Sequence, residues 1–145
     1  LLFGGGLSLA SSVAASGLDS WFGQQVQGLA MLPGILLVAA VVTMILFLTE
    51  VTSNTATAAT FIPILGGVAL GIGGDAMSFL IPAAFAATCA FMLPVGTPPN
   101  AIVFGTGAVS IRQMARGGFV LNIIGIGLIT AVCYIIGGPV MGLKF

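Results

Sequence analysis

One polar run, Thr49–Thr57, interrupts an otherwise apolar stretch of the chain. Apolar segments flank it on both sides, Gly34–Leu48 before it and Ala58–Ile72 after it. At about 15 residues each, these flanks would form helices of roughly 22 Å, short of a hydrocarbon core of roughly 30 Å. The pattern fits a hairpin of two short helices over residues 33–72 that enters a membrane and turns back at a tip near residues 52–56. It fits equally a surface link between two ordinary spanning helices, in which the polar residues cap the helix ends.

Charged residues are so few in this chain that its composition indicates whether it lies in water or in a membrane. Of its 145 residues, 59% are hydrophobic and 4% are charged, whereas a soluble domain carries about 25% charged residues. We therefore expect an all-α integral membrane protein, multi-pass in the cell membrane (the inner membrane if the source is bacterial), with the lipid bilayer around it. The formal net charge is zero, so we expect no nucleic-acid partner. The chain has no histidine, which removes most metal sites and histidine-based catalysis, and we expect no enzymatic activity.

Two segments precede the hairpin. Residues 1–17 are apolar and rich in small residues, and are expected to be the end of a spanning helix. Residues 18–32 carry apolar residues at helical spacing, with Trp21 beside them, and predict an interfacial amphipathic helix; a plain loop is the alternative. Because the chain opens without Met inside an apolar stretch, we expect it to be a fragment of a longer protein.

A second interruption follows the hairpin. An apolar helix is expected over Ala76–Leu93, and the two adjacent prolines that come after it cannot continue a helix. Yet Ala101–Val109 is apolar again and is too short to span a membrane alone. We therefore expect a discontinuous helix over residues 76–110, broken at residues 94–100; a short extracellular loop between two spans is the alternative. Broken segments of this kind are the best sequence pointer to the binding site of a transporter.

The C-terminal part is expected to contain one more spanning helix. The segment Ile111–Gly117 carries Arg112 and Arg116, and short loops that bear arginine tend to be cytoplasmic. The sequence that follows is almost wholly apolar, so we expect the terminal spanning helix over residues 117–143.

Backbone oxygens freed at the two interruptions would suit a small hard cation. Carbonyl groups at the end of the first hairpin arm, at Gly96 and at Pro98 are oxygen ligands of the kind that bind Na⁺ in transporters. Side-chain oxygens of Thr49 and Asn54 would complete the shell. We expect Glu50 to steady the tip through hydrogen bonds, with a direct ligand role as the alternative.

The same interruptions would suit an anion. Helices restart at about Thr55 and at about Pro99, and a helix N-terminus presents free N–H groups and the positive end of its dipole. Hydroxyl groups of Ser53, Thr55 and Thr97 and the amide of Asn54 would add neutral donors. A cation and a carboxylate would then bind side by side, which is a physical route to coupled transport.

These motifs resemble a known family. Ser53-Asn54-Thr55 at a hairpin tip, followed by Gly96-Thr97-Pro98-Pro99-Asn100, is similar to the second repeat of the divalent anion:sodium symporters, which carry dicarboxylates, tricarboxylates and sulfate. The segments Phe3–Leu7 and Glu50–Thr52 fit as well, and the resemblance covers essentially the whole chain. It implies one half of an inverted-repeat transporter, whose partner is the N-terminal repeat of the same polypeptide. It also implies a homodimer, an elevator-like shift, and an arm helix over residues 18–32.

The resemblance implies a site as well. Its sodium ligands would be Thr49, Thr52, Asn54, Gly96 and Pro98, and its substrate-binding residues would be Ser53, Asn54, Thr55, Thr97 and Pro98. The implied function is secondary active transport of a divalent anion, a C4-dicarboxylate such as succinate or else citrate, coupled to Na⁺. Two alternatives stay open: a sodium-independent dicarboxylate exchanger of the same family, and an ion channel with a re-entrant loop.

Overall fold

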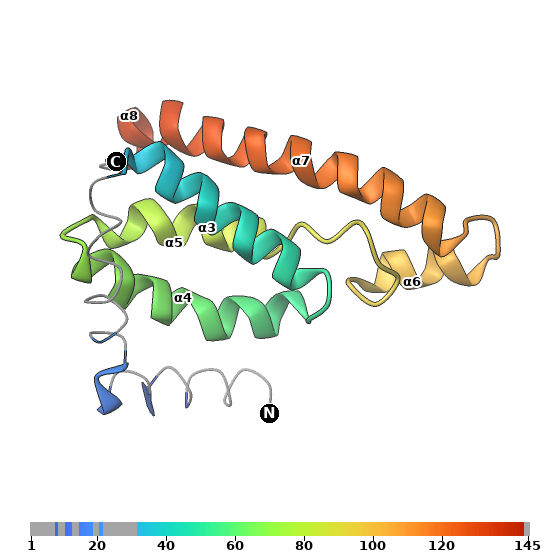
Figure 1. Cartoon of the computed structure of the whole chain (residues 1–145), viewed down its shortest axis with the longest axis horizontal. Helices are drawn as coiled ribbons and strands as arrows, with labels where there is room; N and C mark the ends of the chain where they lie inside the picture. Colours follow the sequence, from blue (N-terminus) through green and yellow to red (C-terminus); the bar gives the residue numbers. More distant parts are fainter. Residues whose placement is uncertain (1–7, 9–10, 13–14, 19–20, 22–31, 144–145) are drawn as a thin grey trace.

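The computed structural model describes residues 8, 11–12, 15–18, 21 and 32–143. All regular structure in this part of the chain is helical, in agreement with the expected all-α class. The helices are α3 (Gly34–Thr49), α4 (Asn54–Gly71), α5 (Ala76–Ala86), α6 (Pro98–Gly105), α7 (Ile111–Ile135) and α8 (Gly137–Met141) (Figure 1). The helix end expected over residues 1–17 and the arm helix expected over residues 18–32 lie mostly outside the described residues.

Helices α3 and α4 run antiparallel and are joined by a tight turn at residues 50–53 (Figure 1). The expected tip near residues 52–56 therefore lies partly inside α4, which already begins at Asn54. For this reason α4 has 18 residues, more than its apolar flank alone. Among the described residues, α4 and α7 are long and apolar enough to cross a membrane, whereas α3 and α5 are shorter apolar helices.

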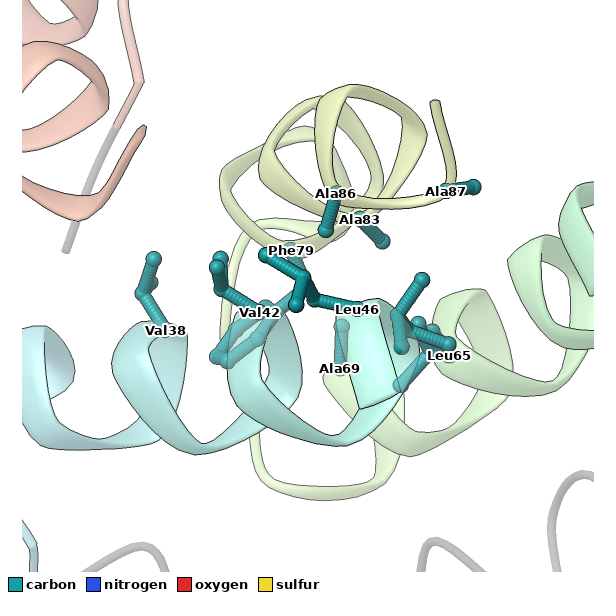
Figure 2. Packing of buried hydrophobic residues seen from close by; sticks show 10 residues of the cluster. Val38, Val42, Leu46, Leu65, Ala69, Phe79, Ala83, Ala86 and Ala87 are labelled. Carbon is teal, nitrogen blue, oxygen red and sulfur yellow. The ribbon is translucent and has the colours of Figure 1, made fainter. Parts of the chain in front are cut away.

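Helix α5 packs between the two arms of the hairpin (Figure 1). Its alanines are small, so the backbones of α3 and α4 can approach it closely, which is how helices associate in lipid. The cluster that results combines residues of all three helices and of the turn after α5 (Figure 2). Its members are Val38, Val42, Ile45, Leu46, Leu65, Ala69, Phe79, Ala83, Ala86 and Ala87.

The interruption after α5 is longer than expected. The helix expected over Ala76–Leu93 ends at Ala86, and the chain has no regular helix until α6 begins at Pro98. The expected break at residues 94–100 thus starts too late and ends too late. The prolines explain only where the new helix starts. The earlier end of α5 depends on side chains from elsewhere that bind the backbone of residues 90–93, as described below.

The last spanning helix also differs from expectation at both ends. Helix α7 begins at Ile111, because Ser110 and Gln113 form a capping box across its first turn. Arg112 and Arg116 therefore belong to the first turns of a helix and not to a loop. For the helix expected over residues 117–143, the predicted C-terminal end was also wrong, since α7 stops at Ile135 and the short α8 follows.

Candidate functional site

The hairpin tip is tied to the start of the break by two polar side chains. Thr49 is fully buried, and its hydroxyl oxygen lies 2.6 Å from Oδ1 of Asn54 and 3.1 Å from the carbonyl oxygen of Ala87. The amide of Asn54 donates to the carbonyl of Thr88 at 3.4 Å. Two predicted sodium ligands, Thr49 and Asn54, are thus neighbours. They also meet backbone carbonyls from just beyond α5, which the sequence analysis did not include.

A third predicted ligand, Thr52, lies on the other side of the tip. Its hydroxyl group donates to the carbonyl of Leu48 at 2.9 Å and shares a short hydrogen bond with the hydroxyl of Thr57. Thr52 therefore closes the turn between α3 and α4 and keeps its oxygen close to the end of α3.

The tip leaves several backbone groups without partners. Ser53 is the N-cap of α4, but its side chain makes no capping hydrogen bond. In residues 32–143 no hydrogen bond engages the N–H groups of Asn54, Thr55 and Ala56, which precede the helical ladder. The carbonyl groups of Thr49 and Glu50 likewise accept no backbone hydrogen bond in this stretch. The tip therefore offers free donors at the start of α4 and free oxygens at the end of α3.

Glu50 binds the break. The residue is 3% exposed, and its carboxylate accepts hydrogen bonds from the N–H groups of Phe91, Met92 and Leu93 at 2.8 to 3.2 Å. The amide of Asn122 in α7 donates to the same carboxylate at 2.7 Å. The expected hydrogen-bonding role of Glu50 is therefore correct, but its partners are the break and α7. These bonds supply acceptors to amides that a continuous helix would have paired internally.

Asn100 and Thr97 satisfy other groups of the break. The side-chain amide of Asn100 donates to the carbonyls of Ala90 at 2.8 Å and Leu93 at 3.1 Å. Thr97 is the N-cap of α6, and its hydroxyl oxygen accepts from the N–H of Asn100 at 3.4 Å.

The expectation of free N–H groups at the start of α6 was wrong. Its first two residues, Pro98 and Pro99, have no N–H, and the next amide is the one that Thr97 caps. Pro98 is the first residue of α6, so its carbonyl belongs to the helical ladder.

The tip and the break line one cavity of about 570 Å³. The turn between α3 and α4 faces the segment that joins α5 to α6 (Figure 1). The tip supplies Val51, Thr52 and Ser53, and the break and α6 supply Pro94, Val95, Gly96, Thr97, Pro98, Ala101 and Phe104. Of the predicted site residues, the cavity wall contains Thr52, Ser53, Gly96, Thr97 and Pro98; Thr49, Asn54 and Thr55 are not part of it.

Gly96 is where the two interruptions come closest. A Cβ added at Gly96 would lie 3.6 Å from the carbonyl oxygen of Glu50 and 3.0 Å from the Cβ of Ala90. A side chain at this position would therefore crowd the break and cover the free carbonyl at the end of α3.

Two residues of α7 belong to this assembly and were missed by sequence reasoning. A Cβ added at Gly118 would lie 2.5 Å from the Cα of Met92 and would overlap the carbonyl of Phe91, so the helix packs directly on the backbone of the break. Asn122, one turn further along the same face, is fully buried. The signal in the sequence was a single asparagine within a long apolar helix, which marks a buried polar contact.

Comparison with known proteins gives a consistent picture. Residues 1–143 match a family model described as the sodium:sulfate symporter transmembrane region. A protein named sodium-dependent dicarboxylate transporter SdcS from Staphylococcus saprophyticus is 47% identical over 143 residues. Proteins of the same name from Staphylococcus aureus strains MRSA252 and USA300 are 50% and 49% identical. Each alignment covers 99% of this chain and 28% of the relative, so the chain spans less than a third of the length of these transporters.

Proposed function

The chain belongs to the sodium:sulfate symporter family, and from this premise we propose that the protein carries C4-dicarboxylates such as succinate across the cell membrane together with Na⁺. The chain is part of a multi-pass membrane protein, and the relatives it matches are transporters and not enzymes. One observation carries the proposal: the hairpin tip and the helix break, far apart in sequence, line one cavity.

We assign the sodium ion to the oxygens around the end of α3. The carbonyls of Thr49 and Glu50 accept no backbone hydrogen bond from residues 32–143, and that of Glu50 faces Gly96 across the break. Neutral oxygens released at helix interruptions are the ligands that transporters use for Na⁺. Pro98 would contribute through the carbonyl lone pair that the helical ladder leaves unused. Besides the carbonyl of Glu50, the ligands proposed are Thr49, Thr52, Asn54, Gly96 and Pro98.

We assign one carboxylate of the substrate to the start of α4. The N–H groups of Asn54 and Thr55, which have no partner within residues 32–143, lie at the positive end of this helix dipole, beside the Ser53 hydroxyl, which makes no capping bond. Across the cavity, Thr97 still has its hydroxyl hydrogen to donate, because its oxygen only accepts from Asn100. Pro98 would supply an apolar contact. Because cation and anion then share the tip, binding of the first favours binding of the second.

Several further features follow from family membership and belong to the proposal. The hairpin of α3 and α4 would be re-entrant, and α5 and α6 would be the two halves of a discontinuous helix. An N-terminal repeat in the remaining polypeptide would supply the other half of the substrate site. The protein would work as a homodimer in which this domain moves by an elevator-like shift.

The test is uptake of radiolabelled succinate by the full-length protein in liposomes. An inward Na⁺ gradient should accelerate uptake at least about tenfold over an equal choline or potassium gradient, because the anion binds well only beside the cation.

Two other outcomes would replace this proposal. Uptake that is unchanged in choline but requires dicarboxylate inside the liposomes would identify a sodium-independent exchanger. Large single-channel currents in a planar bilayer would identify a channel.

A further inference from the structure

Much of the surface of the cavity between the tip and the break is apolar. One face of α6 contributes to it, because Pro98, Ala101 and Phe104 follow one another at intervals of three residues and all line the cavity. Val95 in the break and Val51 at the tip extend this surface. We call these five residues the apolar wall. None of their side chains can donate or accept a hydrogen bond, so the wall suits a part of a ligand that needs none.

The polar side chains that we assign to the substrate lie next to this wall. At the tip, Ser53 precedes the start of α4, where a carboxylate is assigned. On the other side of the cavity, the hydroxyl group of Thr97 has its hydrogen to donate. Val95 comes two residues before Thr97, and Ala101 lies about one helical turn after it. A ligand bound by the Thr97 hydroxyl therefore meets apolar side chains from both sides of that group.

We propose that the apolar wall makes the site selective for an anion with an unsubstituted carbon chain, and against inorganic sulfate and hydroxylated dicarboxylates. This inference rests on the proposed function and names the part of the site that chooses the substrate. Succinate carries its oxygens at its ends and has methylene groups between them, and burial of these groups against the wall is favourable. Sulfate has oxygens on every side. Those that face the wall would lose hydrogen bonds to water and gain none.

Tartrate is a sharp probe of this selectivity. It has the same two carboxylates as succinate and adds a hydroxyl group to each central carbon, so any difference in affinity comes from the chain and not from the charged ends. An apolar pocket disfavours an added hydroxyl group by about a hundredfold at most. We therefore expect the wild-type protein to bind tartrate and sulfate at least about tenfold more weakly than succinate.

The experiment measures dissociation constants of succinate, tartrate and sulfate for the purified full-length protein at saturating Na⁺. Val95→Thr exchanges a methyl group for a hydroxyl group, and Ala101→Ser adds one. Val95 is 76% exposed and Ala101 is also exposed in this part of the polypeptide, so stability should change little. In the double variant we expect weaker succinate binding and equal or tighter tartrate binding, which together reduce the preference for succinate about tenfold. Each single variant should show a part of this change.

Two controls separate the polarity of the wall from other effects. Val103→Thr is the same exchange in α6 at a residue that is not part of the cavity wall, and should leave all three constants within about twofold of wild type. Val95→Ile changes the shape of the wall but keeps it apolar, so the preference for succinate over tartrate should persist.

Three results would overturn the proposal. They are an unchanged preference in the double variant, an equal loss of preference in Val103→Thr or Val95→Ile, and wild-type protein that binds tartrate or sulfate as tightly as succinate. In each of these cases Na⁺-dependent binding of succinate would still support the proposed function. Wild-type protein that binds no succinate in the presence of Na⁺ would refute both the proposed function and the selectivity.

Discussion

Ser53 and Thr97 each precede a helix that restarts after an interruption, yet only Thr97 caps its helix. At the break, Thr97, Asn100 and Glu50 bind several of the amides and carbonyls that a continuous helix would have paired. At the tip, Ser53 makes no capping bond, and the first amides of α4 have no hydrogen-bond partner within residues 32–143. Side chains therefore bind part of the backbone of the break, whereas at the exposed tip no side chain in residues 32–143 binds the first amides of α4.

This difference suggests a division of labour. The tip would bind the anion and supply much of the ligand shell of the cation. The break would be a rigid surface that keeps the tip in position. Changes at the break should therefore reduce stability first, and changes at the tip should reduce affinity first. Each of the following substitution pairs tests this contrast.

The largest effect is expected at the contact between α7 and the break. Gly118→Ala places a methyl group where the backbone of Phe91 and Met92 already lies, and overpacking of this kind costs about 1–3 kcal/mol or more. We expect a marked fall in melting temperature and loss of uptake.

Gly117→Ala is the matched control, since a Cβ there meets nothing within 4 Å. It should be neutral or slightly stabilising in the same helix. Equal melting temperatures for the two variants would show that α7 does not support the break.

A smaller effect, of a different kind, is expected when the two asparagines are compared. Asn54→Ala removes a side chain that belongs to both proposed ligand sites, so the affinities for Na⁺ and succinate should each fall about tenfold or more. Both are measured by titration of the full-length protein.

Asn100→Ala instead leaves the carbonyl of Ala90 without a donor and removes one of the two donors to the carbonyl of Leu93. It should lower the melting temperature, at a cost of about 1–3 kcal/mol for the unpaired carbonyl, with a lesser loss of affinity. Sodium affinity that survives Asn54→Ala intact would contradict a tip shared by cation and anion.

The smallest effects are expected at the two N-cap residues. Thr97→Ala removes a capping bond and should cost about 1 kcal/mol of stability. Ser53→Ala removes no such bond, so stability should change by less than about 0.5 kcal/mol. Succinate affinity, however, should fall by up to about tenfold if the hydroxyl binds a carboxylate. Thermal unfolding and succinate titration of both variants give the comparison; the reverse pattern would mean that Ser53 is structural.

The sequence alone identified the two interruptions and the residues between them. A polar run in apolar surroundings and a pair of prolines are local signals, because the physical cause acts within a few residues. The family motif lies in these same residues, which is why family and site could be inferred together. The capping box of Ser110 and Gln113 is equally local. The start of α7 could therefore have been predicted from the sequence, although Ile111–Gly117 was assigned to a loop.

Only the tertiary structure decided which backbone groups of the break are hydrogen-bonded by distant side chains. The early end of α5 depends on Glu50, which binds amides 41 to 43 residues away, and Glu50 in turn is held by Asn122, 72 residues away. Gly118 allows the close approach that brings Asn122 to this position. No pattern within a helix reveals such partners, because the hydrogen bonds of an interrupted backbone are completed by whichever side chains the packing of the helices brings near.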